Sequence, residues 1–182
     1  MTIGGEVKSK KEVFMSEAKI TGIYNAGPLF SSAEQRQRKY EGKLLVEYFK
    51  KHEMDQDLIF NPIDLPHNDG SVRTNYEIFI NDYNLMEKAN VFIFDLAEYD
   101  GGTMFELGYA ITRAKKLGDV VAIYPVISDF RAQLRPSGDA IPGWGVNEML
   151  TGSFADPTLK EVVLVVNSFE AVIQDMESRN LH

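Results

Sequence analysis

Three carboxylates stand within one short stretch of this sequence, where an apolar run passes through a loop into a helix-forming segment. Asp95 follows the run VFIF, Asp100 precedes two glycines, and Glu106 lies in the stretch MFELGYA. Asp82, in the preceding segment, could join them. Hard metal ions bind such oxygen ligands, and glycosidic chemistry uses one carboxylate to attack an anomeric carbon and another to handle a proton. The residue types leave both uses open.

The residues around Glu106 favour a ligand site without proving one. Gly101 and Gly102 allow the backbone to come close to a ligand. We expect Glu106 in the first turn of a helix, where the positive end of the helix dipole favours its ionised form. A glutamate there can equally serve only to offset the dipole, and the two interpretations weigh about the same. Tyr24, at the end of the first expected strand, could orient a carboxylate or belong to the core.

These side chains need a scaffold, and the hydrophobic pattern predicts one in which strands and helices alternate. The expected strands are at residues 19–27, 57–62, 91–96, 119–127 and 161–168. Helices are expected from a capping box at Ser31 and Glu34 to about residue 51, over 74–90, after the double glycine, and after Ser168. This alternation predicts an α/β, flavodoxin-like three-layer domain with a five-stranded parallel sheet. Ligands of such sheets bind at the carboxyl ends of the strands.

Composition narrows the classes of function. The chain of 182 residues suits one domain, here 19–182, after an extension at 1–18 that we expect to be disordered. A net charge of −8 argues against nucleic acid or an anionic membrane as partner. Cysteine is absent and the three histidines are scattered, so we expect no metal and no cofactor. The sequence shows no apolar run of membrane-spanning length and no secretory signal, which predicts a cytoplasmic protein.

Three segments together resemble the nucleoside 2-deoxyribosyltransferase family. They are IYNAGPLF at 23–30, FINDYNLMEKANVFIFDL at 79–96 and DGGTMFELGYA at 100–110. The resemblance covers about residues 19–125. It implies a flavodoxin-like fold, a homo-oligomer (dimer, tetramer or hexamer), and nucleoside salvage by base exchange. The partners it implies are a 2'-deoxynucleoside and a free purine or pyrimidine base.

The resemblance also implies roles for single residues. Glu106 matches the family's nucleophile, and Tyr24 matches the tyrosine that orients it. Asp100 and Asp82 match residues that contact the substrate and handle protons on the base. A carboxylate that attacks C1' forms a covalent deoxyribosyl ester, and attack by a second base gives net retention.

Further substrate contacts are expected at the same edge of the sheet. They come from Gly27, Phe30, Asp95 and Gly102. In the family, a residue of a neighbouring subunit holds the 5'-hydroxyl group, and Asn147 and Ser153 are both candidates here.

Other activities stay open beside base exchange. Arg131 and Arg135, in the polar insertion at 128–145, could bind a 5'-phosphate. The chain could then be a 2'-deoxynucleoside 5'-monophosphate N-glycosidase that uses Glu106 and water. An NAD-cleaving enzyme and a non-catalytic nucleotide-sensing module are more distant alternatives.

Overall fold

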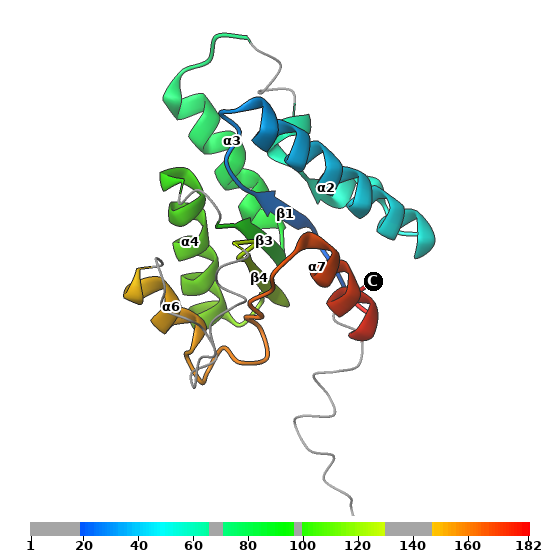
Figure 1. Cartoon of the computed structure of the whole chain (residues 1–182), viewed down its shortest axis with the longest axis vertical. Helices are drawn as coiled ribbons and strands as arrows, with labels where there is room; N and C mark the ends of the chain where they lie inside the picture. Colours follow the sequence, from blue (N-terminus) through cyan, green and yellow to red (C-terminus); the bar gives the residue numbers. More distant parts are fainter. Residues whose placement is uncertain (1–18, 66–70, 97–99, 130–146) are drawn as a thin grey trace, which may run out of the picture.

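The computed structural model describes residues 19–65, 71–96, 100–129 and 147–182 (Figure 1). The expected N-terminal extension at 1–18 and the arginines Arg131 and Arg135 lie outside the described residues. The elements are β1 (Ile23–Ala26), α2 (Ser32–Lys51), η1 (Gln56–Leu58), β2 (Ile59–Phe60), η2 (Pro62–Asp64), α3 (Asn75–Lys88), β3 (Val91–Asp95), α4 (Gly101–Leu117), β4 (Ala122–Val126), α6 (Glu148–Phe154) and α7 (Phe169–Ser178).

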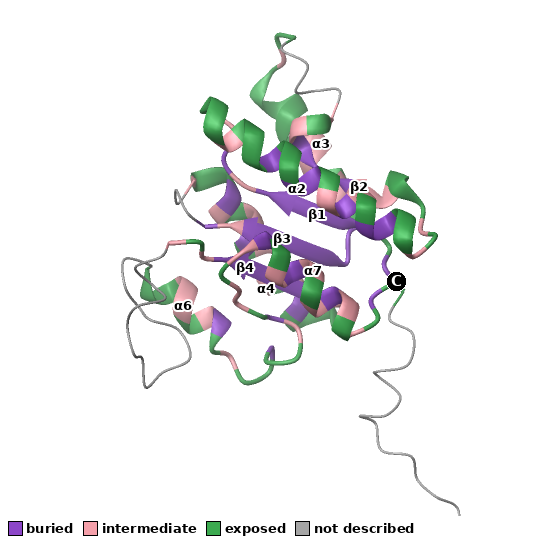
Figure 2. Cartoon of the chain, turned by 45° about the vertical axis from the view of Figure 1, so that its right-hand side comes forward, coloured by how far each residue is buried: buried purple, intermediate pink, exposed green. Residues whose placement is uncertain are grey.

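The sheet is parallel throughout, with strand order β2-β1-β3-β4. In its register Tyr24 of β1 lies beside Phe92 of β3. Every residue of β1 and β4 is buried, as expected for strands covered on both faces. The strands accordingly lie between helices in Figure 2.

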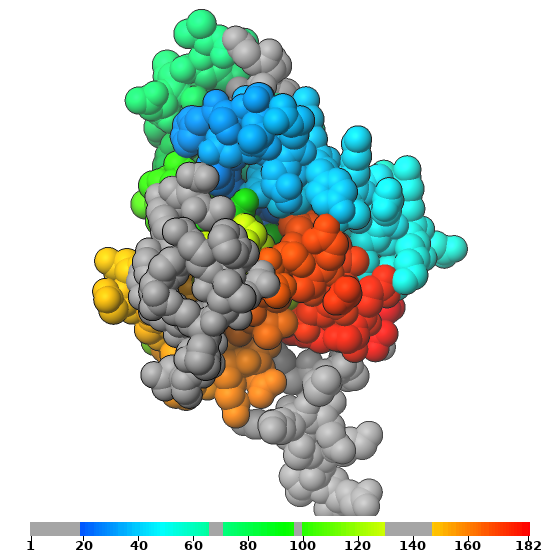
Figure 3. Space-filling view, viewed as in Figure 1, coloured from blue at the N-terminus to red at the C-terminus, as the bar shows by residue number. Residues whose placement is uncertain are grey.

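Two apolar clusters, one on each face of the sheet, make three layers. On one face Phe92 and Phe94 pack with Met86 of α3 and with Leu107 and other residues of α4. On the other face the strands pack with α2 and α7, through Leu45, Phe49, Val172 and Met176 among others. Helices α2 and α7 adjoin on this side, as Figure 3 shows. The flavodoxin-like layering is therefore confirmed.

The prediction of a fifth strand at 161–168 is wrong. Within the described residues, this segment meets β4 only at two isolated bridges, Ile123 with Val163 and Val126 with Val166. The backbone amides of Val162 and Val163 donate to the carbonyl of Leu159, which closes a turn. Leu164 and Val166 donate to the carbonyls of Ile123 and Pro125 in β4. Pro125 has no backbone N–H to donate in return, so the two bridges are not joined into a continuous ladder.

The helix starts follow the local sequence closely. Capping boxes are present at Ser31 with Glu34, as predicted, and at Thr74 with Glu77. Ser168 caps α7, also as predicted. Gly118 ends α4 in the left-handed conformation, at φ 66°, which glycine adopts without strain.

One helix start differs from the prediction in a way that concerns the chemistry. Helix α4 begins at Gly101, and Asp100 is its N-cap. Glu106 therefore lies in the second turn and not in the first. The double glycine is part of the helix because the Asp100 side chain accepts a hydrogen bond from the backbone N–H of Thr103.

Candidate active site

Glu106 and Tyr24 form the centre of the candidate site. The Tyr24 hydroxyl donates to Glu106 Oε1 over 2.7 Å, across 82 residues of sequence. Tyr24 is fully buried in β1, and its ring contacts Phe92 of the adjacent strand. A tyrosine fixed in this way holds one carboxylate oxygen in a defined place. The orienting role expected of Tyr24 is compatible with this geometry.

The surroundings of Glu106 change its titration. Burial raises the pKa of Glu106 to about 7, the charges of Asp82 and Asp100 raise it as well, and the hydrogen bond from Tyr24 opposes them. Burial and the Glu106 charge raise the pKa of Tyr24 too, so the phenol stays protonated and remains a donor. The expected effect of the helix dipole on Glu106 is therefore outweighed by desolvation. A carboxyl group with such a pKa at a cleft is typical of a functional site.

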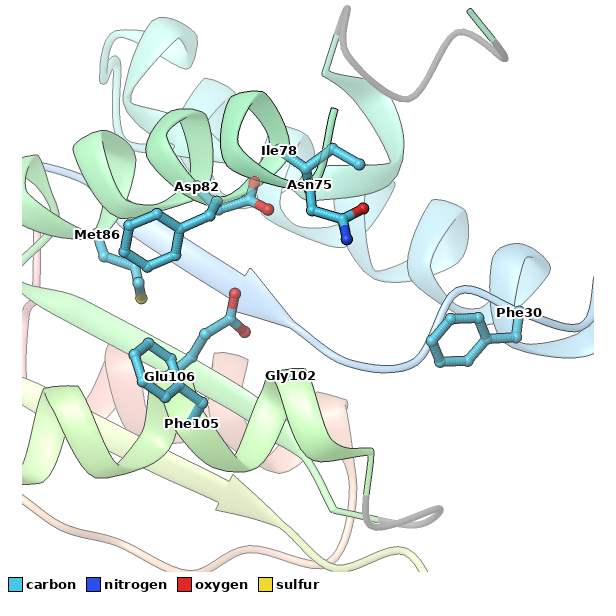
Figure 4. A pocket seen from close by; sticks show the side chains of 9 residues that line it. Phe30, Asn75, Ile78, Asp82, Met86, Gly102, Phe105 and Glu106 are labelled. Carbon is cyan, nitrogen blue, oxygen red and sulfur yellow. The ribbon is translucent and has the colours of Figure 1, made fainter. Parts of the chain in front are cut away.

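A pocket of about 700 Å³ opens above Glu106, between α3 and α4, in the size range of ligand sites. Figure 4 shows Asp82 and Asn75 of α3 pointing into the same space as Glu106 of α4. The lining residues are Phe30, Asn75, Ile78, Phe79, Asp82, Met86, Gly102, Phe105 and Glu106.

The two aspartates expected to handle protons occupy different places. Asp82 lines the pocket opposite Glu106. Asp100 is not among the lining residues, and its Oδ2 accepts from the backbone N–H and the hydroxyl of Thr103, at 2.8 and 2.9 Å. Asp100 thus caps α4 and acts on Glu106 through its charge.

Asp95 and Gly27, both expected to bind substrate, contact a buried arginine. Arg38 Nη2 donates to Asp95 Oδ2 at 2.6 Å and to Glu41 Oε1 at 2.7 Å. Its Nη1 donates to the carbonyl oxygen of Ala26 at 3.2 Å. A Cβ atom at Gly27 would lie 1.7 Å from Arg38 Nη1, so any side chain there would displace the guanidinium group. Neither Asp95 nor Gly27 is among the pocket-lining residues.

The remaining expected contacts divide between the pocket and a separate helix. Phe30 and Gly102 line the pocket. Asn147 is the N-cap of α6, where its side chain accepts from the backbone N–H of Met149, and Ser153 donates to the carbonyl of Leu150. Neither Asn147 nor Ser153 lines the pocket of its own chain.

Sequence reasoning missed most of the α3 wall as a binding surface. Asn75, Ile78, Phe79 and Met86 share one face of the helix with Asp82. Their spacing around Asp82 was the signal that could have found them. Phe105, beside the nucleophile candidate, was missed as well.

The described part of the chain contains neither a metal-binding group of side chains nor a membrane-spanning helix. Among residues 19–65, 71–96, 100–129 and 147–182, no group of three or more His, Cys, Asp or Glu side chains has a geometry suited to a metal ion. Across those same residues, no helix combines the length and the apolarity that crossing a membrane requires.

Comparisons with known proteins identify a matching family and a relative of this chain. The family model described as nucleoside 2-deoxyribosyltransferase matches residues 23–174. An uncharacterized protein of Ureaplasma parvum serovar 3 is 33% identical over 112 residues, which are 60% of this chain and 71% of that protein.

Two solved structures share the fold. A conserved protein from Enterococcus faecalis V583 superposes with a TM-score of 0.57 at 20% identity, covering 88% of this chain and 99% of that one. A 2-desoxiribosyltransferase from Leishmania mexicana gives a TM-score of 0.54 at 22% identity, covering 88% and 99% respectively. At these identities the similarity concerns the fold.

Proposed function

Because the chain belongs to the nucleoside 2-deoxyribosyltransferase family, we propose that it exchanges the base of a 2'-deoxynucleoside for a free purine or pyrimidine base. The observation that carries the proposal is the hydrogen bond from Tyr24 to Glu106 beneath an open pocket. It combines a carboxylate that can attack with a group that fixes its position. No metal or cofactor takes part in the reaction as we propose it.

In the first step, Glu106 attacks C1' of the deoxyribose from the face opposite the base. Tyr24 holds Oε1, so Oε2 is the attacking atom. The bond from Oε2 to C1' forms while the C1'–N bond breaks, and the bonding electrons leave with the base. The negative charges of the nearby carboxylates stabilise the positive charge that develops on the sugar.

The departing base needs a proton, because its anion is a poor leaving group. Asp82 is the better placed acid, since it lines the pocket and points toward Glu106. Asp100 supports the reaction through its negative charge and is the second candidate for the proton. In the second step a new base attacks C1' from the face that the first base left, and its proton passes to the carboxylate of Asp82. The bond from C1' to Glu106 Oε2 breaks, and the two inversions give net retention.

The lining of the pocket favours a nucleoside over a nucleotide donor. The described lining residues include the carboxylates Asp82 and Glu106 but no Arg, Lys or His. A 5'-phosphate is bound best by cationic partners, and two carboxylates would repel it.

Transfer also requires that water stays away from the ester until the second base arrives. We propose that a homo-oligomer closes the pocket, with Asn147 or Ser153 of a neighbouring subunit at the 5'-hydroxyl group. The reaction then belongs to nucleoside salvage in the cytoplasm.

The experiment that tests this function is incubation with deoxyinosine, with and without adenine, followed by chromatography of the products. We expect deoxyadenosine and hypoxanthine when adenine is present, and little deoxyribose when it is not. Release of hypoxanthine at the same rate without adenine would identify a hydrolase. Faster cleavage of deoxyinosine monophosphate than of deoxyinosine would identify the nucleotide N-glycosidase, and no reaction with either would favour a sensing module.

A further inference from the structure

Asn75, on the α3 wall of the pocket, has a position that capping does not explain. It is the first residue of α3, and Thr74 together with Glu77 already caps that helix. Asparagine stabilises helix starts chiefly at the N-cap, one position earlier. The residue is exposed, and within the described part of the chain its amide makes no hydrogen bond. The start of the helix therefore does not depend on this amide.

The geometry instead directs the amide toward a ligand. Asn75 and Asp82 are seven residues apart, which is about two helical turns and places them on the same face. Figure 4 shows the Asn75 amide pointing into the space that Asp82 and Glu106 share. A ligand whose C1' lies at Glu106 and whose base nitrogen lies at Asp82 extends from there along the α3 wall.

We propose that Asn75 is a base-recognition residue that reads the exocyclic group next to the protonated ring nitrogen. An asparagine amide offers both a donor and an acceptor, and rotation about its last bond exchanges them. Its oxygen accepts from the amino group of adenine, and its N–H donates to the oxygen of hypoxanthine. The pocket then takes 6-amino and 6-oxo bases alike. This inference rests on the proposed function, because it assumes a base leaving from C1' above Glu106.

Substituting the amide by a carboxylate separates the two kinds of base. Asn75→Asp keeps the acceptor and loses the donor, so it still pairs with an amino group but repels a base oxygen. We expect the rate of hypoxanthine release from deoxyinosine to fall at least tenfold relative to adenine release from deoxyadenosine. Asn75→Leu removes both functions and should slow both reactions while keeping their ratio within about threefold.

A matched control comes from the same helix. Asn84 is exposed on α3 and does not line the pocket, so Asn84→Asp introduces the same charge without touching the ligand. We expect its ratio of the two release rates to equal that of the parent protein. The ratio also cancels any effect of the new charge that is common to both bases.

The readout does not depend on transfer. Base release is measured whether the acceptor is a base or water, so a hydrolase outcome would overturn the proposed function but leave the Asn75 test intact. Binding of the two nucleosides to Glu106→Gln, with and without Asn75→Asp, gives the same comparison by calorimetry without turnover. An unchanged ratio in Asn75→Asp, or an equal change in Asn84→Asp, would overturn the role of Asn75.

Discussion

Acidic side chains near the same edge of the sheet fall into two groups, which differ in the charge of their hydrogen-bond partner. The pair of Glu41 and Asp95 is held by the guanidinium group of Arg38, at 2.7 and 2.6 Å. Glu106 is held by the neutral phenol of Tyr24, at 2.7 Å. Arg38 is almost completely buried, at 1% exposure, while Glu106 borders an open pocket. The distances are nearly equal, but the charge of the partner differs.

The comparison shows how residues of the same type divide between structure and chemistry. A positive partner neutralises the carboxylate and is not free to leave it, because removing one member of a buried ion pair leaves an uncompensated charge. A neutral partner fixes the position of the carboxylate but leaves its charge for a substrate. Burial raises the pKa of both glutamates, to about 7 for Glu106, and what opposes it differs: the charge of Arg38 lowers the pKa of Glu41, whereas the hydrogen bond from the phenol of Tyr24 lowers that of Glu106.

The largest effect is expected from removing the attacking group. Glu106→Gln keeps the size of the side chain and an acceptor for Tyr24, but it cannot form the ester. Base exchange should fall on the order of a thousandfold or more, with the fold intact. Chromatography of the exchange products and a thermal unfolding curve measure the two. Exchange near the rate of the parent protein would show that Glu106 is not the nucleophile.

The next largest effect is expected at Arg38, the cation that holds Glu41 and Asp95. Arg38→Met leaves the buried carboxylate of Glu41 and the partly buried carboxylate of Asp95 without their cation, and we expect a loss of about 3 kcal/mol in the free energy of unfolding. Denaturant titration measures it. Adding Asp95→Asn to Arg38→Met should recover part of the loss, since one uncompensated charge is removed. A stable Arg38→Met protein that has lost only activity would place Arg38 in the chemistry and break the comparison.

Tyr24→Phe tests whether the neutral partner tunes the nucleophile. The hydrogen bond from Tyr24 lowers the pKa of Glu106, so its removal should raise that pKa further above 7. Attack requires the ionised carboxylate, so the rate rises with pH through this pKa, and the rising limb should move to higher pH in the variant. At pH 7 we expect roughly a tenfold slower exchange. A pH profile with an unmoved limb would contradict the tuning role.

The smallest effect separates two functions of Asp100. Asp100→Ala removes the N-cap of α4 and should cost about 1 kcal/mol in the free energy of unfolding, while Asp100→Asn keeps a capping oxygen and should cost little. If Asp100 also handles a proton, the Asn variant should slow exchange most for the bases that are hardest to expel. Equal rates in the Asn variant and the parent protein, for every base, would limit Asp100 to capping.

The layered α/β fold, the starts of α2 and α7 and the end of α4 could be predicted from the sequence, because they depend on local pattern. Ser31, Ser168 and Gly118 act through backbone groups only a few residues away. Short segments of characteristic spacing also allowed the family to be predicted, and they gave Glu106, Tyr24 and Asp82 as candidate site residues.

The partners of those residues depend on the tertiary structure. The pairing of Tyr24 with Glu106 spans 82 positions, and the capture of Asp95 by Arg38 spans 57. The edge segment at 161–168 has the apolar content of a strand, but Pro125 of β4 has no N–H to donate to it, so the two bridges between them stay isolated. The pKa of Glu106 follows from burial between α3 and α4, a property of the assembled layers that no local spacing encodes. Local sequence patterns determine the helices and strands, and partners far along the chain determine which carboxylate remains available for chemistry.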